Sequence, residues 1–362
     1  MFWYFFSNIL VYIAVVGILV YLIRTQRRGA FYKKWYFLLL PIFIWLGTYA
    51  YCTGDYVHYR DLVFRLGINI ENATHIEKYY VALIELTNAN YDVWRLVIYI
   101  LVFVLMYHAL CLSKRDTYYS LLWFSLMMLP EAMNAVRTTL AFWAFLVGLL
   151  YVNNGGKRSI LSMIFFLIAV EAHRSIAPLL LLLPFCFIRL NKMAMFALCL
   201  LVPIFSFLLE DTALSFLIGH GLVEKEGISK YSTYARGTMK SIGSTIEFFI
   251  YRIPYIIISL SLVLRQIKQN RIIEKSAFKR LGGFTNAFIL FLLGALFLFG
   301  YNNPMYYRYE MFLWYFLLIL VPYLYPKQYY FQGKNIWSFV GYMLLVQVYR
   351  LSLGGYYESF KY

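Results

Sequence analysis

Residues 35–50, WYFLLLPIFIWLGTYA, indicate the fold class of this chain. The run contains no charged side chain, and the charged stretch 51–62, YCTGDYVHYRDL, follows it at once. A bilayer core takes about 20 apolar residues per helical span, and only helices or closed barrels satisfy every backbone polar group there. Because the apolar runs are long and continuous rather than alternating, they predict helices.

The whole chain shares the composition of this run. It has 362 residues, of which 62% are hydrophobic and only 14% are charged, too few to cover a soluble globule. We therefore expect an all-α, polytopic α-helical membrane protein with about ten to twelve transmembrane helices. The twelve predicted spans are roughly residues 6–23, 35–51, 93–112, 118–131, 136–152, 159–173, 175–188, 193–209, 245–264, 284–301, 306–325 and 335–353.

The charges of the connecting segments support this division. Alternate loops, beginning with residues 24–34, hold 19 Lys/Arg and two acidic residues, whereas the rest of the chain holds 14 basic and 15 acidic residues. Positive charge collects in cytoplasmic loops of membrane proteins, so these loops are predicted to be cytoplasmic and both termini to lie outside. The net charge of +16 then faces anionic lipid, and no nucleic-acid partner is expected.

The chain shows no repeat, low-complexity tract or second soluble domain. Residues 1–362 are therefore predicted to form one membrane domain, with outer-face loops at about 52–92 and 210–244. Segment 75–87, HIEKYYVALIELT, has the helical apolar period of a helix lying in the membrane interface. The N-terminus lacks a basic region and a cleavage site, so the first span is expected to be retained.

Three arginines on the predicted outer face need an explanation. Arg137 opens the fifth span, Arg174 lies in the turn EAHRSIAP, and Arg308 lies in YNNPMYYRYE. Basic residues at span ends often only reach toward lipid headgroups, and tyrosines there often form an aromatic belt. These arginines sit in very short turns or just inside apolar runs, where a cation costs about 2.5–3.5 kcal/mol. Guanidinium groups pair with phosphate oxygens, so the three predict a diphosphate site.

A polyprenyl diphosphate sugar would suit such a site. Sugar transfer needs a base for the acceptor hydroxyl and positive charge for the departing diphosphate. We expect Asp55 or His173 to be the base and the arginines to supply the charge. No acidic pair stands out as a Mg²⁺ site, and the four cysteines form no metal-binding motif, so no metal or cofactor is predicted.

The order of these motifs resembles that of a known family. TGDYVHY (53–59) and EKYYVALIEL (77–86) precede NAVRTTLAFWAFLVGLLYV (134–152), AVEAHRSIAPLLLL (169–182) and YYRYEMFLWYF (306–316). This order resembles the EpsG branch of Wzy-type polysaccharide polymerases over roughly residues 45–325. Thr138 stands where the family has Gln, and the first motif reads CTGDY rather than GTDY.

The resemblance implies a glycosyltransferase with GT-C-like architecture in the bacterial cytoplasmic membrane. Such an enzyme joins undecaprenyl-diphosphate-linked repeat units on the outer face, to make capsule, O-antigen or exopolysaccharide, beside a flippase and a chain-length regulator. The residues that the resemblance implicates are Asp55, Tyr56, Tyr59, Arg137, Ala141, His173, Ser175 and Arg308. Substrate contacts are also expected from Glu77, which leads the interface helix, and from Tyr234 and Arg236 in the outer loop 210–244, which we expect to gate acceptor entry.

Other functions remain alternatives at this point. A flippase or transporter of lipid-linked precursors should carry ionisable residues near mid-membrane in both halves, whereas here only Glu247 and Arg252 lie so deep. A membrane O-acyltransferase should carry functional polar groups on the inner side, where the loops hold mainly topology charges. A purely structural partner in polymer export would leave the arginines unexplained.

Overall fold

The computed structural model describes residues 2–25, 40–45, 78–113, 117–129, 132, 135–154, 159–188, 192–208, 279–299, 306, 308–316 and 340–348. Every regular element among these residues is a helix, which confirms the all-α class for the described part of the chain. Within the described part of the chain, two helices are long and apolar enough to cross a membrane, α5 (Tyr91–Ser113) and α8 (Val136–Asn154). Shorter apolar helices cover Ile9–Ile23, Ile160–Ala172, Met193–Phe205 and Arg280–Leu296.

The helices fall into two compact units. The first unit comprises Met1–Tyr151, Gly156–Ile176 and Tyr315–Tyr362, and the second comprises Val152–Gly155 and Ala177–Trp314. Besides α5 and α8, the first unit contains α1 (Phe2–Thr25), α4 (Lys78–Leu86), α6 (Thr117–Met127), α9 (Ser159–Ala172) and the 3₁₀ turn η3 (Arg174–Ile176). The second contains α10 (Ala177–Leu180), η4 (Leu183–Cys186), α11 (Lys192–Leu208) and α16 (Lys279–Phe299).

Helix α8 forms the centre of the first unit. All of its residues from Thr138 to Tyr151 are buried, as expected of a helix that is apolar on every side. Gly148 lets α9 approach closely, because a Cβ atom there would lie 2.7 Å from the ring of Phe166. The same ring packs against Phe145, with 5.0 Å between the centroids. Small residues at helix contacts are a common packing device in membrane proteins.

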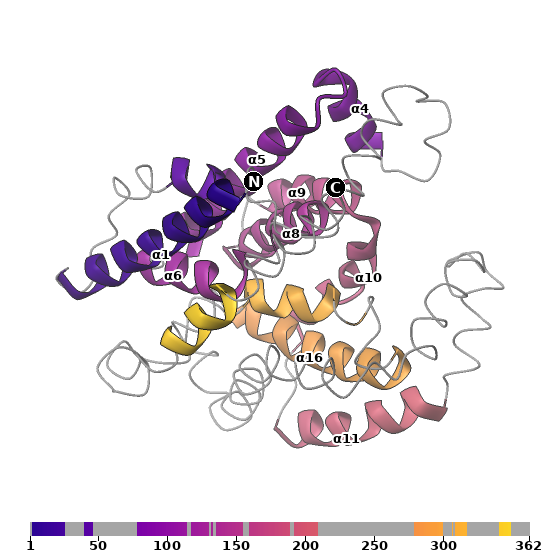
Figure 1. Ribbon diagram of the computed structural model, residues 1–362. Coiled ribbons are helices and arrows are strands. Elements are labelled where there is room, and N and C mark those ends of the chain that lie inside the picture. The colour runs from indigo at the N-terminus through magenta and orange to yellow at the C-terminus, as the bar shows by residue number, and fades with distance from the viewer. Residues whose placement is uncertain are drawn as a thin grey trace. The chain divides into compact units, whose positions relative to one another are not determined.

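The end of α6 is tied to two distant segments. The Tyr12 hydroxyl of α1 donates to the Ser125 carbonyl at 2.8 Å, and Gln347 Nε2 donates to the Leu126 carbonyl at 2.6 Å. The last four carbonyls of a helix have no intrahelical partner, and leaving them unpaired in apolar surroundings is costly. The two bonds therefore complete the end of α6 and hold α1 beside it (Figure 1).

In the second unit, α11 and α16 pack side by side (Figure 1). The start of α16 is joined to the end of α8, because Arg280 Nη1 donates to the Val152 carbonyl at 2.7 Å and Asn153 Oδ1 accepts the Leu281 N–H at 3.3 Å. Gly283 lies directly against the backbone carbonyl of Phe185, so no larger residue fits there without a shift of backbone. Backbone contacts thus position this end of α16.

The predicted span at 175–188 is wrong as a single helix. The chain forms the 3₁₀ turn η3, one turn of helix in α10, a two-residue turn and the 3₁₀ turn η4. Pro178 and Pro184 explain the breaks, since proline lacks the N–H that continues a helix and its ring clashes with the preceding turn. The broken helix runs only from Arg174 to Cys186, which is shorter than a spanning helix requires.

Several other described helices agree with their predicted ranges, but α6 ends at Met127 rather than at 131 and α16 begins at Lys279 rather than at 284. The prediction of 136–152 corresponds to α8, 159–173 to α9, and 193–209 to α11. The predicted interface helix at 75–87 corresponds to α4. The predicted span at 245–264 lies outside the described residues, and the number of spans and their orientation stay predictions.

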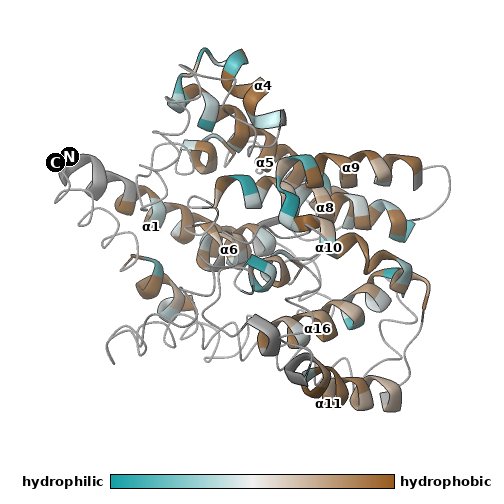
Figure 2. Cartoon of the chain, turned by 90° about the vertical axis from the view of Figure 1, so that its right-hand side faces the viewer, coloured by the Kyte–Doolittle hydropathy of each residue, from teal (hydrophilic) through white to brown (hydrophobic). Residues whose placement is uncertain are grey.

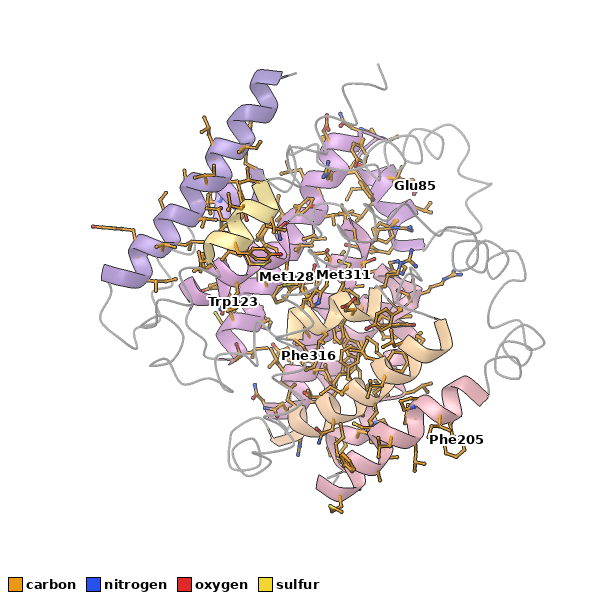
Figure 3. All side chains as sticks on the ribbon, turned by 60° about the horizontal axis from the view of Figure 1, so that its bottom comes forward. Glu85, Trp123, Met128, Phe205, Met311 and Phe316 are labelled. Carbon is orange, nitrogen blue, oxygen red and sulfur yellow. The ribbon has the colours of Figure 1, made fainter. Side chains whose placement is uncertain are left out.

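Two helices present apolar surface outward (Figure 2). On α9, Ile160, Met163 and Leu167 each expose 65% or more of their surface. On α11, Met193 is 77% exposed and Phe205 is 56% exposed; Figure 3 labels Phe205. Exposed apolar faces of this length are unfavourable in water but suit contact with lipid chains. The exposed faces therefore indicate a membrane protein.

Candidate functional site

The α4–α5 hairpin forms one wall of the candidate site. Asn88 and Ala89 turn the chain with positive φ angles of 51° and 54°, a conformation that favours Asn and is strained for Ala. Asn90 then caps α5, because its Oδ1 accepts the N–H groups of Asp92 and Val93, each at 3.1 Å. The cap and the tight turn set the position of α4 against α5.

Aromatic side chains fill the space between these helices. Tyr80 packs against Trp94 with 6.0 Å between the ring centroids, and Tyr91 stacks on Trp94 at 5.8 Å. Tyr79 contacts Tyr80 edge-on at 5.6 Å. Burial raises the pKa of the Tyr79 phenol, so its hydroxyl stays protonated at neutral pH and acts as a hydrogen-bond donor.

Arg137 stands over this aromatic cluster. It is the second residue of α8 and is half-buried, with its Cζ atom 5.5 Å from the centroid of the Tyr80 ring. A cation over an aromatic face gains about 0.5–1 kcal/mol at an exposed site and more when water is excluded. The contact therefore restricts the guanidinium, whose fork of donors matches phosphate oxygens.

Arg95 is a buried cation that the sequence analysis missed. It exposes only 1% of its surface, and its Cζ atom lies 5.8 Å from the centroid of the Tyr99 ring. The Tyr99 hydroxyl donates to the Ala132 carbonyl at 2.8 Å, which ties α5 to the segment before α8. A basic residue within the apolar run 93–112 was the signal that could have found it, because a buried charge requires polar partners.

His173 follows α9 directly and is 8% exposed. Its backbone N–H donates to the Ala169 carbonyl, and its carbonyl accepts the Ile176 N–H, both at 3.0 Å. Its ring Nδ1 accepts the backbone N–H of Ser175 at 3.3 Å and lies 3.0 Å from Ser175 Oγ. The backbone and the ring of His173 are therefore both held by the turn that follows α9.

Helix α4 connects these features, since it packs against both α5 and α9. Tyr80 of α4 lies under Arg137, and His173 directly follows α9, which α4 contacts. A guanidinium, an imidazole and several phenols in one part of a unit can bind an anion with charged and neutral hydrogen bonds. This part of the first unit is the candidate functional site.

The other two arginines of the predicted diphosphate site have different settings. Arg174 belongs to η3 and is exposed. Arg308 is half-buried and belongs to the second unit, where the adjacent Tyr309 ring packs edge-on against Phe291 at 4.8 Å. Because Arg137 and Arg174 lie in one unit and Arg308 in the other, the convergence of all three stays a prediction.

Several predicted site residues lie outside the described part of the chain. These are Asp55, Tyr56, Tyr59, Glu77, Tyr234 and Arg236. Of the remaining motif positions, Ala141 is fully buried within α8, where a small side chain suits close packing. Among the residues that the structure describes, no group of three or more His, Cys, Asp or Glu side chains could hold a metal ion.

Comparison with known proteins identifies a relationship at the level of the family. The chain matches the family described as the EpsG family over residues 33–360. No curated protein and no solved structure matches it. The family match includes the whole candidate site, from α4 through α8 to His173.

Proposed function

The chain belongs to the EpsG family, and from this premise we propose that it is a Wzy-type polysaccharide polymerase. The family and the apolar helices indicate a membrane protein of exopolysaccharide biosynthesis. In the proposed reaction, the protein joins undecaprenyl-diphosphate-linked oligosaccharide repeat units on the outer face of the bacterial cytoplasmic membrane. The proposal includes about ten to twelve spans, GT-C-like architecture and both termini outside.

The observation that carries this proposal is the setting of Arg137. A cation is placed at the start of α8, the most buried apolar helix of its unit, and is held over the Tyr80 ring. A half-buried guanidinium at this place can offer its paired N–H donors to an anionic ligand, and the low polarity of the neighbouring helix core strengthens such a contact. A lipid-borne diphosphate fits both features, since its tail lies among apolar helices and its head pairs with guanidinium.

The proposed chemistry is displacement at the anomeric carbon of the growing chain. The acceptor hydroxyl forms the new glycosidic bond while the bond to the lipid diphosphate breaks, and a base takes the hydroxyl proton. Arg137, with Arg174 and Arg308, would stabilise the charge that develops on the diphosphate. Asp55 and His173 are the two candidates for the base, and Tyr56, Tyr59, Glu77, Tyr234 and Arg236 would contact sugars.

Replacing Arg137 tests the proposal. A strain that lacks the gene would be complemented with wild type, Arg137→Lys or Arg137→Ala, and polymer length would be measured by gel electrophoresis and light scattering. We expect about a 100-fold loss of polymer for Arg137→Ala, comparable to removal of one donor to a developing oxyanion. Arg137→Lys should also be impaired, because an ammonium group cannot form the paired contacts of a guanidinium.

Arg280→Lys is the matched control. Arg280 is also the second residue of an apolar helix and also lies over an aromatic ring, but outside the candidate site. It should support full-length polymer. Inactive Arg137 variants should accumulate single lipid-linked repeat units that are accessible from outside the cell, whereas loss of a flippase would trap them inside. Full-length polymer from Arg137→Ala at normal protein levels would refute the proposal.

A further inference from the structure

The hydrogen bonds of His173 define which of its ring nitrogens carries the proton. The backbone N–H of Ser175 can only donate, so Nδ1 must present its lone pair to it at 3.3 Å. A histidine ring always keeps at least one N–H, which places the proton on Nε2. The Ser175 hydroxyl, 3.0 Å from the same Nδ1, must then also act as a donor.

The local backbone explains why the chain holds this arrangement. His173 occupies the position before η3, where a side-chain acceptor commonly caps the free N–H groups of a turn. Its own N–H and carbonyl are bonded to Ala169 and Ile176, so the residue cannot rotate without breaking the end of α9. The spacing of histidine and serine in the sequence AHRSI thus has a structural cause: the second residue after the histidine meets Nδ1.

We propose that Ser175 holds His173 as the Nε2–H tautomer, so that Nε2 donates a hydrogen bond to a diphosphate oxygen of the lipid-linked substrate and the ring is not the base. This inference rests on the proposed polymerase function. The packing of α4 also supports this inference, because α4 lies against α9 and carries Tyr80, whose ring lies under Arg137. A cation and an N–H donor together suit an anionic oxygen.

The proton count agrees with this role. Nε2 is protonated and the lone pair of Nδ1 is engaged by the two donors of Ser175, so neither ring nitrogen is available to take a proton from the acceptor hydroxyl. During transfer, the hydroxyl oxygen bonds to the anomeric carbon, the carbon–diphosphate bond breaks, and the hydroxyl proton goes to a carboxylate base. The Nε2 proton stays in place throughout. Asp55 is then the candidate from the sequence for that carboxylate.

Two amide substitutions separate the donor role from the base role. The side-chain nitrogen of Gln can occupy the position of Nε2, whereas that of Asn reaches only the position of Nδ1. We expect His173→Gln to keep polymerisation within about tenfold of wild type, and His173→Asn and His173→Ala to lose about 100-fold, the effect of a donor to a charged group. If His173→Gln is as inactive as His173→Ala at equal levels of folded protein, the donor role is overturned.

Ser175 is a positioning residue in this scheme, and a double substitution tests it. Ser175→Ala should reduce polymerisation about threefold to tenfold, because one of two donors to Nδ1 is lost, whereas Ser175→Thr should restore it. In the His173→Gln background, Ser175→Ala should have little further effect, because glutamine has no tautomer to fix. An equal loss in both backgrounds would mean that Ser175 acts only on the fold.

A measurement without activity keeps the inference separate from the proposed function. The protein would be labelled with ¹⁵N-histidine, and the His173 signals would be assigned by their absence in His173→Gln. An unprotonated Nδ1 and a protonated Nε2 are expected. A protonated Nδ1 would overturn the tautomer assignment even if the enzyme polymerises, whereas a wild-type protein that fails to polymerise with the expected ¹⁵N signals would refute only the function and the donor role that depends on it.

Discussion

Arg137 and Arg280 occupy corresponding places in two different regions of the molecule. Each is the second residue of an apolar helix, and each lies over an aromatic ring, at 5.5 Å from Tyr80 and 5.2 Å from Phe187. Arg280 also donates to the Val152 carbonyl, so its charge serves to join two backbone segments. Arg137 instead stands in a cluster of tyrosines on the helix hairpin that contacts α9.

The comparison shows that an arginine at the head of an apolar helix is not in itself a functional signal. In the Arg280 region, the guanidinium is engaged by the Val152 carbonyl and lies over the Phe187 ring, and the neighbouring Asn153 side chain accepts the Leu281 N–H, so these described contacts serve to join backbone segments. In the Arg137 region, the surrounding groups can donate hydrogen bonds. Substitutions in the Arg280 region should therefore mainly lower the stability of the protein, and substitutions in the Arg137 region should mainly lower its activity.

The largest effect on stability should come from Gly283→Ala. A Cβ atom at Gly283 meets the backbone carbonyl of Phe185, which cannot move without shifting η4. Because the clash is with backbone rather than with a side chain, the loss should exceed the roughly 1–3 kcal/mol of ordinary overpacking and should outweigh the gain of about 1 kcal/mol in helix propensity. Thermal unfolding of the purified protein, followed by intrinsic fluorescence, would measure the loss.

Gly148→Ala is the matched control for that substitution. Its Cβ atom would meet the ring of Phe166, a side chain that can rotate, so the net change in stability should lie within about 1 kcal/mol. If Gly148→Ala destabilised the protein more than Gly283→Ala, the expectation that substitutions in the Arg280 region mainly lower stability would be wrong.

An intermediate effect is expected for Arg280→Ala. The variant loses a charged hydrogen bond to the Val152 carbonyl, which contributes about 1.5–3 kcal/mol, and should unfold at a lower temperature. At permissive temperature its polymer should have normal length. Arg137→Ala should show the reverse pattern, with a stability close to wild type and shortened polymer. Equal losses of stability in both variants would mean that the two arginines have the same structural role.

The smallest effect is expected from substitution of the aromatic rings that lie under the two arginines, Tyr80 and Phe187. Tyr80→Leu removes the cation–π contact, worth about 0.5–1 kcal/mol, and should weaken binding of undecaprenyl diphosphate about threefold. Tyr80→Phe should weaken it less, because the ring remains. Phe187→Leu should leave this binding unchanged. Binding can be measured by titrating purified protein with undecaprenyl diphosphate, and equal weakening by Tyr80→Leu and Phe187→Leu would remove the distinction between the regions.

The helices of this chain could largely be predicted because their signal is local. The prediction of 136–152 differs from α8 by two residues at one end, and 159–173 differs from α9 by one. The prediction of one helix over 175–188 was wrong because it relied on the apolar composition of the run. The run contains Pro178 and Pro184, and the effect of proline on backbone geometry outweighs hydrophobicity. The family could also be predicted, because the order of its short motifs along the chain can be read directly from the sequence.

The site could be predicted only in part. Arg137 and His173 were identified as candidates from the sequence. In the structure, Arg137 lies over Tyr80 of α4, and His173 follows α9, which α4 contacts. Arg95 was missed, although it is almost fully buried, because a single basic residue near the start of an apolar run is usually taken as a charge at the span end. Its burial depends on Tyr99 and on the segment before α8, which only packing brings together.

The amino-acid sequence alone was sufficient to establish an apolar helical chain and its family, because helix length and hydrophobicity are properties of contiguous residues. It could not establish which ring lies under which arginine, since Tyr80 and Arg137 are distant in the chain and meet only through the packing of separate helices. Nor could it show which nitrogen of His173 holds the proton. That depends on a side-chain rotamer and a hydrogen-bond direction, which exist only once the turn after α9 has formed.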